Sequence, residues 1–263
     1  MELGLKGRPA LVAAASRGLG RACALSLASE GASVAICGRD PAALEAAREE
    51  IASSTGSTVV AIPADVSREE DAIRFVREGA EALGGCQILV TNAGGPPMGA
   101  FEGLDDDAFR GALDGLLFST LRMARAAIPE MRAAGYGRVV VISSIAVKQP
   151  IPNLILSNAA RAAVAGWAKT LADEVARDGI TVNSIMPGRV WTDRVRSLIE
   201  HAAEGSGRSI EEERAVQEAL IPVGRFGKPE EVGDLVAYLA SPRAAYVTGT
   251  SILVDGGLYR GLM

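Results

Sequence analysis

The sequence predicts an α/β fold in which a doubly wound parallel sheet of seven strands carries helices on both faces. Short apolar runs rich in β-branched residues alternate with longer segments rich in Ala, Leu, Glu and Arg. Nearly unbroken apolarity is typical of parallel strands that are covered on both sides. Regular alternation of strands and helices indicates right-handed crossovers. We therefore expect one Rossmann-like domain that spans residues 1–263.

The expected strands are the apolar runs at residues 9–14, 33–37, 58–62, 87–91, 138–142, 180–185 and 251–254. Segments with one apolar stripe predict helices at residues 41–53, 68–83, 105–134 and 156–177. Residues 192–227 break the alternation with two helical stretches, around residues 194–203 and 210–220, joined by Glu-Gly-Ser-Gly. Because glycine permits a hinge, we expect this segment to be a flap on the substrate side. A decorated surface loop is the alternative.

Composition excludes several classes of protein. The chain has 263 residues, of which 48% are hydrophobic and 22% charged, as in a globular protein with a full core. A net charge of −5 and only 4% aromatic residues argue against a nucleic-acid-binding surface. No leader pattern or membrane-spanning run is evident. Three scattered cysteines and the lone His201 give no metal-ligand pattern and no histidine-dependent triad. We expect a cytoplasmic protein without metal, membrane or nucleic-acid partners.

A glycine-rich turn follows the first expected strand. Glycines at a strand–helix junction let a phosphate group approach the backbone and the N-terminus of the next helix. The glycine pair alone is a weak motif, and its place at the first junction strengthens it. We expect a dinucleotide to bind the turn residues Ser16, Arg17, Gly18, Leu19 and Gly20.

The end of the second strand predicts which dinucleotide binds. A protein that selects NAD places a carboxylate here to bind the ribose 2′-hydroxyl. This chain has Gly38 followed by Arg39, and Arg17 lies in the nearby turn. Two guanidinium groups favour a 2′-phosphate, so we expect NADP(H) rather than NAD(H). Alternatively, both arginines are solvated surface charges, and Asp40-Pro41 simply begins a helix.

Polar residues also follow the third and fourth strands, at the sheet edge where open α/β sheets bind ligands. Asp65 could hydrogen-bond the adenine amino group, or it could cap the next helix, where Ser67 is a competing cap. The residues expected to bind the cofactor at these two strand ends are Asp65, Val66, Asn92, Ala93 and Gly94.

With these landmarks the chain resembles the short-chain dehydrogenase/reductase family over essentially its whole length, most closely its 3-oxoacyl-ACP reductase-like branch. Further matching motifs are Ser143-Ser144 after a strand, Pro187-Gly188 with Thr192, and Val254-Asp-Gly-Gly257. The resemblance implies that the Asn-Ala-Gly segment backs the adenine pocket and that the protein assembles as a homotetramer. It also places Pro187, Gly188, Val190 and Thr192 at the nicotinamide end.

The catalytic pattern of that family is rewritten in this chain. Ser144 is retained, but Ser157 stands where the family has tyrosine, Arg161 where it has lysine, and Leu116 where it has a helix asparagine. A serine hydroxyl is far less acidic than a phenol, and an arginine does not release a proton at working pH. The glycine turn also differs from the family pattern, because Ala13-Ala14 stands where the family usually has Thr-Gly.

Two further cations are candidates for the altered site. Lys148 lies four residues after Ser144 in an apolar loop and could donate a proton, although an exposed loop lysine is the alternative. Arg189 could meet an anionic substrate group, or it could pair with Asp193 or another surface acid. The expected apolar substrate pocket comprises Pro96, Pro97, Met98, Phe101, Ile145, Val147, Leu154 and Trp191.

These observations predict an NADP(H)-linked oxidoreductase that acts on a small carbonyl, alcohol or acyl compound. Its expected catalytic residues are Ser144, Ser157, Arg161 and Lys148. Two alternatives from other classes remain open. One is a nucleotide-binding protein with little redox turnover that serves as a sensor or partner subunit, and the other is a lyase or isomerase that reuses the pocket.

Overall fold

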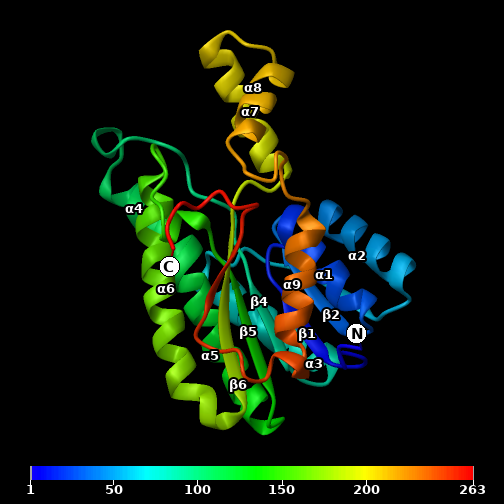
Figure 1. The fold of residues 1–263 in the computed structure, drawn as a ribbon. Helices are drawn as coiled ribbons and strands as arrows, with labels where there is room; N and C mark the ends of the chain where they lie inside the picture. Colours follow the sequence, from blue (N-terminus) through cyan, green and yellow to red (C-terminus); the bar gives the residue numbers. More distant parts are fainter. Residues whose placement is uncertain (1, 263) are drawn as a thin grey trace.

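A seven-stranded parallel sheet forms the centre of the molecule, with the strand order β3-β2-β1-β4-β5-β6-β7. The computed structural model describes residues 2–262 (Figure 1). The strands are β1 (Pro9–Val12), β2 (Ser33–Gly38), β3 (Val59–Pro63), β4 (Ile88–Thr91), β5 (Gly137–Ile142), β6 (Ile180–Pro187) and β7 (Ser251–Val254). The order reverses between β1 and β4, which makes their carboxyl ends the switch point where such sheets bind ligands.

Both faces of the sheet are covered, as the unbroken apolar runs predict. Side chains alternate between faces along a strand. In β1, Ala10 and Val12 join one buried cluster with α1, α2 and α9, whereas Leu11 joins a second cluster with α3, α5 and α6. These two cores explain why most strand residues are apolar. The prediction of a doubly wound α/β fold is confirmed.

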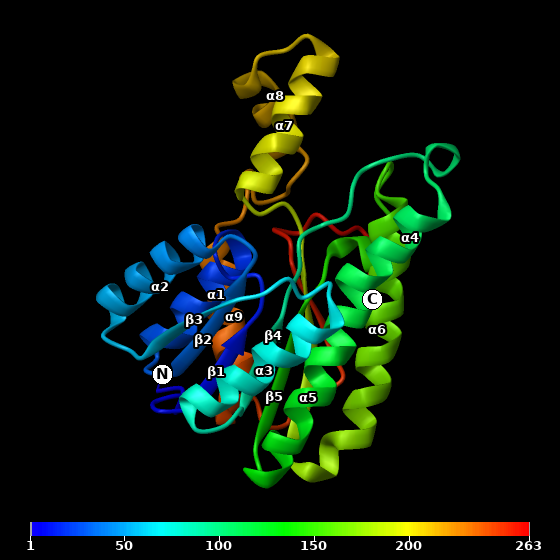
Figure 2. The same cartoon turned by 180° about the vertical axis from the view of Figure 1, so that it is seen from behind.

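Helices α1, α2 and α9 lie on one side of the sheet, and α3, α5 and α6 lie on the other (Figures 1 and 2). The α-helices are α1 (Gly18–Ser29), α2 (Pro41–Thr55), α3 (Glu69–Leu83), α4 (Asp106–Leu113), α5 (Ser119–Ala133), α6 (Ile155–Val175), α7 (Asp193–Ser206), α8 (Ile210–Ala219) and α9 (Pro229–Ala240). Single 3₁₀ turns occur at Phe101–Gly103, Ile145–Val147, Ala176–Asp178 and Pro242–Ala244.

The chain is helical from Asp106 to Ala133, as expected for residues 105–134, but it is not α-helical throughout. A π-helical turn, Asp114–Phe118, separates α4 from α5. It contains the buried Leu116 and accommodates one extra residue in the helical ladder. Hydrophobic periodicity does not reveal such a turn, because the apolar stripe resumes after it.

Helices α7 and α8 project beyond the carboxyl edge of the sheet, away from the body of the domain (Figures 1 and 2). We expected residues 204–207 to form the connection between the two helices, and this prediction is partly wrong. Helix α7 continues to Ser206, and only Gly207, at φ 70°, ends it. Ser209 and Glu212 form a capping box that starts α8 directly afterwards. A small apolar cluster of Ile199, Ile221 and Phe226 joins this hairpin to the chain below it.

No helix within residues 2–262 combines the length and the apolarity needed to cross a membrane. Cys23, Cys37 and Cys86 are buried, and burial raises the pKa of each thiol to about 12. Thiols in this state are poor nucleophiles and poor metal ligands, so these side chains act as core residues.

Candidate active site

The turn after β1 is fixed by backbone contacts to both neighbouring strands. The amide of Ala13 donates to Val90 O at 3.0 Å, and the amide of Ala15 donates to Cys37 O at 2.8 Å. Gly20 begins α1 so close to this turn that an added Cβ would lie 2.2 Å from Ala14 O. Ala14 itself adopts φ 49°, a conformation that favours glycine. The turn therefore has the close helix–strand approach of a phosphate-binding junction, with one alanine in a strained position.

The end of β2 is closely packed against the turn after β1, and it carries no acidic side chain. A Cβ added at Gly38 would lie 3.2 Å from the Cβ and Oγ atoms of Ser16 in the turn. Arg17 and Arg39 are exposed on this edge, and neither has an ion-pair partner among residues 2–262. Asp40 accepts hydrogen bonds from the amides of Ala42 and Ala43. Its carboxylate is thus the N-cap of α2, which leaves the two guanidinium groups available.

Asp65 is held by its own loop. Its Oδ1 atom accepts from Ser67 N at 3.1 Å and from Ser67 Oγ at 2.8 Å. Neither of the two alternative caps is observed: Arg68 rather than Asp65 or Ser67 is the N-cap of α3, and no side chain caps the helix. Val66 is 7% exposed and packs in the core, so its side chain is not available to a ligand.

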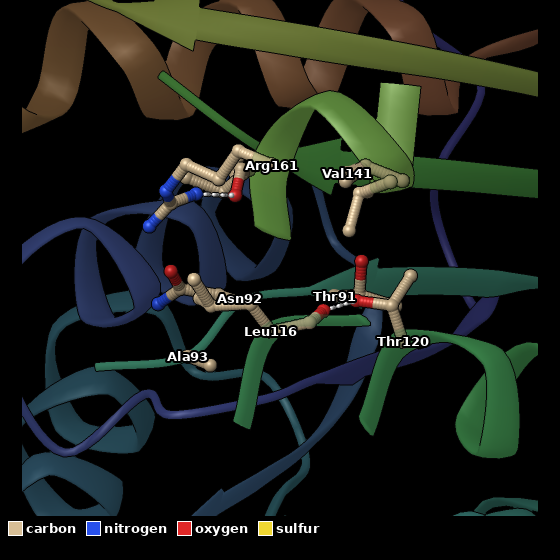
Figure 3. Close-up of a pocket in the computed structure, with 9 residues that line it drawn as sticks. Thr91, Asn92, Ala93, Leu116, Thr120, Val141 and Arg161 are labelled. Atoms are coloured by element: carbon tan, nitrogen blue, oxygen red, sulfur yellow. Dashed lines mark hydrogen bonds between the residues drawn. The ribbon is translucent and has the colours of Figure 1, made fainter. Parts of the chain in front are cut away.

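Asn92 joins the two strands at the switch point. Its Nδ2 donates to Ala14 O at 3.4 Å, across from β4 to the turn after β1. Asn92 and Ala93 also line a small cavity of about 10 Å³ with Arg161 and Leu116. Figure 3 shows the Asn92 amide and the Arg161 guanidinium at the same end of this cavity. The buried hydroxyl of Thr91, another lining residue, has no hydrogen-bond partner in the described chain.

The segment after β6 runs past the start of α1. A Cβ added at Gly18 would lie 3.8 Å from Thr192, and the Thr192 hydroxyl accepts from Val195 N to begin α7. Gly188 is required by packing, since a Cβ there would lie 2.6 Å from Asp255. Val190 is 4% exposed and belongs to the core. Thr192 therefore lies beside the glycine turn, whereas the Val190 side chain anchors the segment in the core.

Ser157 and Arg161 bond to each other on α6. Their i,i+4 spacing places them on one helix face. Arg161 Nε donates to Ser157 Oγ at 3.1 Å, and Arg161 Nη1 donates to Ile142 O at 3.1 Å. Burial lowers the pKa of the Arg161 guanidinium to about 10, and repulsion from Arg194 adds to this effect. The arginine remains charged at neutral pH and cannot relay protons.

Ser144 and Lys148 flank the 3₁₀ turn that follows β5. Ser144 Oγ accepts from Ala146 N at 3.1 Å and caps this turn. The Lys148 ammonium lies 5.5 Å from the ring centre of Tyr259, which is a cation–π contact. Tyr259 comes from the tail after β7, which crosses the carboxyl edge of the sheet toward α4 and α6 (Figure 1).

Arg189 does not form the ion pair expected as one alternative. Its Nη1 donates to Gln217 O at 3.0 Å, so it holds the end of α8, and within residues 2–262 it has no ion pair with Asp193 or another acid. The expected apolar pocket is also only partly assembled. Gly99 N donates to Asn153 O at 2.9 Å and brings those two loops together, but Trp191 packs at 5.1 Å against Phe226 at the base of α7.

Two residues that the sequence analysis missed lie at this edge of the sheet. Arg194, on the first turn of α7, donates from Nη2 to Pro96 O at 3.0 Å. Tyr259 approaches Lys148 from a segment 111 residues away, by the difference of their positions in the chain. Neither has a sequence signal, because both contacts depend on long-range packing.

With this geometry in place, comparison with known proteins identifies the family. The family model described as enoyl-(acyl carrier protein) reductase matches residues 13–259. The chain belongs to the short-chain dehydrogenase/reductase family. The expectation drawn from the sequence motifs is confirmed, and the match includes both the nucleotide half and the altered catalytic half.

Relatives of this short-chain dehydrogenase/reductase are oxidoreductases. It is 31% identical to the uncharacterized oxidoreductase YvrD of Bacillus subtilis, over 100% of both chains. It is 32% identical to 3-oxoacyl-[acyl-carrier-protein] reductase FabG of Vibrio cholerae, over 98% of this chain and 99% of the relative. The structure of L-sorbose reductase from Gluconobacter frateurii, complexed with NADPH and L-sorbose, superposes with a TM-score of 0.95 at 31% identity over 100% of both chains.

Proposed function

We propose that this protein is an NADP(H)-dependent oxidoreductase that transfers hydride between nicotinamide and a carbonyl or alcohol substrate. The observation that carries the proposal is the end of β2. Gly38 stands where an NAD-selective site has its acidic residue, and Arg17 and Arg39 have no ion-pair partner within residues 2–262. The NADPH bound by the L-sorbose reductase relative supports the same cofactor.

The residues of this chain fit a bound dinucleotide. Ser16, Gly18 and Leu19 would present the turn and the start of α1 to the phosphates, and Gly20 permits the approach. Asp65 with Val66, and Asn92 with Ala93 and Gly94, would line the adenine side, while the segment from Pro187 to Thr192 would line the nicotinamide side. Nicotinamide would supply or accept the hydride.

Lys148 would donate the proton that carbonyl reduction consumes. Ser144 would hydrogen-bond the substrate oxygen, since its hydroxyl can donate while it caps the 3₁₀ turn. Reduction of a carbonyl consumes one proton, and an ammonium can give it, whereas Arg161 cannot. Ser157 and Arg161 would position the nicotinamide end. The tail residue Tyr259 would hold the Lys148 ammonium in place.

The test of the cofactor assignment is calorimetric titration with NADPH and NADH. We expect tighter binding of NADPH, and loss of this preference in the Arg17→Ala and Arg39→Ala variants. Each lost charge-assisted hydrogen bond is worth about 1.5–3 kcal/mol, or roughly a tenfold to hundredfold weakening of NADPH binding. Arg48→Ala, which removes an arginine paired with Glu45, is the matched control. Equal affinity for both nucleotides in the unmodified protein would overturn the assignment.

A second function is favoured by the bond between Ser157 and Arg161. With these residues satisfying each other, the protein would bind the nucleotide without efficient turnover and act as a sensor or partner subunit. NADPH binding without oxidation across a broad carbonyl panel would support that function. A lyase or isomerase activity would instead appear as substrate conversion with no net change in NADPH.

We propose a homotetramer in which α6 contributes to an interface. Ala162, Ala163 and Gly166 are exposed on this helix, and small side chains permit close helix packing. We also propose that residues 192–227 close over the substrate within one domain of residues 1–263. Sedimentation equilibrium that shows only monomer would overturn the tetramer.

A further inference from the structure

The chain after β7 folds into a compact turn around one carboxylate. Asp255 Oδ1 accepts from Gly257 N at 2.9 Å, and Oδ2 accepts from Tyr259 N at 2.8 Å. The backbone carbonyl of Asp255 accepts from Leu258 N at 3.2 Å. Aspartate side chains commonly stabilise turns in this way. Because one residue holds three successive amides, we expect residues 255–259 to move as a unit, which we call the tail turn.

The tail turn is attached to the base of the α7–α8 hairpin. Val223 N, just after α8, donates to Gly256 O at 3.2 Å. A Cβ added at Gly256 would lie 2.8 Å from Ile221 Cγ2, so the two segments are in close contact. Leu258 packs against the apolar cluster that Ile221 forms with Ile199 of α7. A movement of the hairpin therefore acts directly on Leu258.

The residue that follows Leu258 contacts Lys148. The ring centre of Tyr259 lies 5.5 Å from Lys148 Nζ, and the tail that carries this ring lies below the hairpin in the view of Figure 1. Within residues 2–262, no carboxylate lies within 4 Å of the ammonium, so no ion pair fixes its position. A lysine side chain is flexible, and the ring restricts where its charge lies. A single peptide unit thus connects the hairpin cluster with the contact at the ammonium.

We propose that Leu258 is a positioning residue for Lys148. A general acid must lie within hydrogen-bond reach of the atom that it protonates. Closure of the hairpin would displace Leu258, and the tail turn would pass this displacement to the Tyr259 ring and so to the ammonium. The proton donor is then ordered by the same movement that encloses the substrate. The proposal rests on the proposed function, which gives the proton to Lys148 and the flap to residues 192–227.

The test follows the Lys148 side chain by NMR. The sequence has four lysines, and reductive methylation with ¹³C-formaldehyde gives each a methyl signal while it keeps its charge. The Lys148 signal is the one missing from Lys148→Arg, and Tyr259→Leu gives its position without the ring. We expect Leu258→Ala to move the signal toward that position. Ile199→Ala, on the hairpin side of the cluster, should move it in the same direction.

Leu262→Ala is the matched control, because this leucine of the same tail is fully exposed. Its Lys148 signal should match that of the unmodified protein. Asp255→Asn loses one of the two carboxylate acceptors with no loss of volume and should also move the signal. This variant replaces Leu258→Ala as the test if the latter does not fold.

Steady-state kinetics measure the consequence for the reaction. We expect kcat to fall by about tenfold in Leu258→Ala and to recover in Leu258→Ile, as a part of the roughly 10²–10⁴ that a general acid contributes. An unchanged Lys148 signal in the tail-turn variant or in Ile199→Ala would overturn the proposal, and so would a moved signal with a normal kcat. If the unmodified protein reduces no carbonyl, the proposed function is wrong, and the NMR signals still decide whether the hairpin and Lys148 are coupled.

Discussion

The nucleotide half and the catalytic half of the sheet obey different constraints. Around β1 and β2, the site is built by backbone approach: Gly20 leaves no room for a side chain, and Gly38 packs closely against Ser16. Around β5 and α6, it is built by side chains that can be exchanged without moving the backbone, as in the bond between Ser157 and Arg161. Sterics therefore preserve the first half, whereas the chemistry of the second half can change on an unchanged frame.

The largest expected effect is in the nucleotide half. Gly20→Ala places a methyl group 2.2 Å from Ala14 O and 2.8 Å from Ala14 C, so α1 must move away from the turn. We expect nucleotide affinity to fall by a factor of about 100 or more, together with a loss of stability of about 3 kcal/mol. Calorimetric titration and urea unfolding measure the two effects.

The matched control is Gly111→Ala in α4, where an added Cβ meets no atom within 4 Å. A helical glycine replaced by alanine changes stability favourably by about 1 kcal/mol or less. Nucleotide affinity should be unchanged in this variant. If Gly20→Ala behaves like Gly111→Ala, backbone approach does not define the nucleotide half.

The second-largest expected effect is a loss of catalytic rate on replacing Lys148 in the catalytic half. Lys148→Arg keeps the charge but removes the group that releases a proton, so we expect kcat to fall by about 10² with little change in KM. Steady-state kinetics of the variant and the unmodified protein measure both parameters. A normal kcat in this variant would rule out Lys148 as the proton donor.

Variants of Tyr259 separate packing from proton donation. Tyr259→Phe keeps the ring against the Lys148 ammonium, so the cation–π contact, worth about 0.5–1 kcal/mol, is retained. We therefore expect kcat to change by less than about threefold. Tyr259→Leu removes the ring and should lower kcat more than the phenylalanine variant does. If Tyr259→Phe loses as much activity as Lys148→Arg, the phenol rather than the ammonium gives the proton.

The smallest effect concerns the strained turn. Ala14 adopts φ 49°, so Ala14→Gly relieves strain of about 1–2 kcal/mol, most of which is offset by the greater freedom of glycine in the unfolded chain. We expect a net gain of about 0.5 kcal/mol in thermal or urea unfolding. Ala13→Gly, at a fully buried neighbour, should instead destabilise the protein by about 1 kcal/mol.

The sequence predicts the features that depend on local chemistry. Strand β7 occupies the expected residues, and β1 ends two residues early at Val12 because the chain leaves the sheet to form the glycine turn. Asp40 caps α2 as one of the two expected alternatives. These features follow from neighbours in the sequence, so periodicity and cap residues are enough to find them.

The features that the sequence does not predict depend on contacts between distant segments. Arg189 bonds to Gln217 and Arg194 bonds to Pro96, 98 residues away, and no local pattern distinguishes these arginines from solvated ones. The contact of Tyr259 with Lys148 likewise requires the path of the tail. The cofactor end of the site is therefore more predictable than its catalytic end.

Trp191, at the base of the projecting α7–α8 hairpin, is an intrinsic fluorescence reporter of the position of the hairpin. Its ring meets Phe226 edge-on at 5.1 Å, and the Arg214 guanidinium lies 4.4 Å from its centre. Because Arg214 belongs to α8, a movement of the hairpin changes the position of the Arg214 guanidinium over the indole. The sequence has one other tryptophan, Trp167, so Trp167→Phe leaves a single emitter whose spectrum and lifetime follow the hairpin in unlabelled protein.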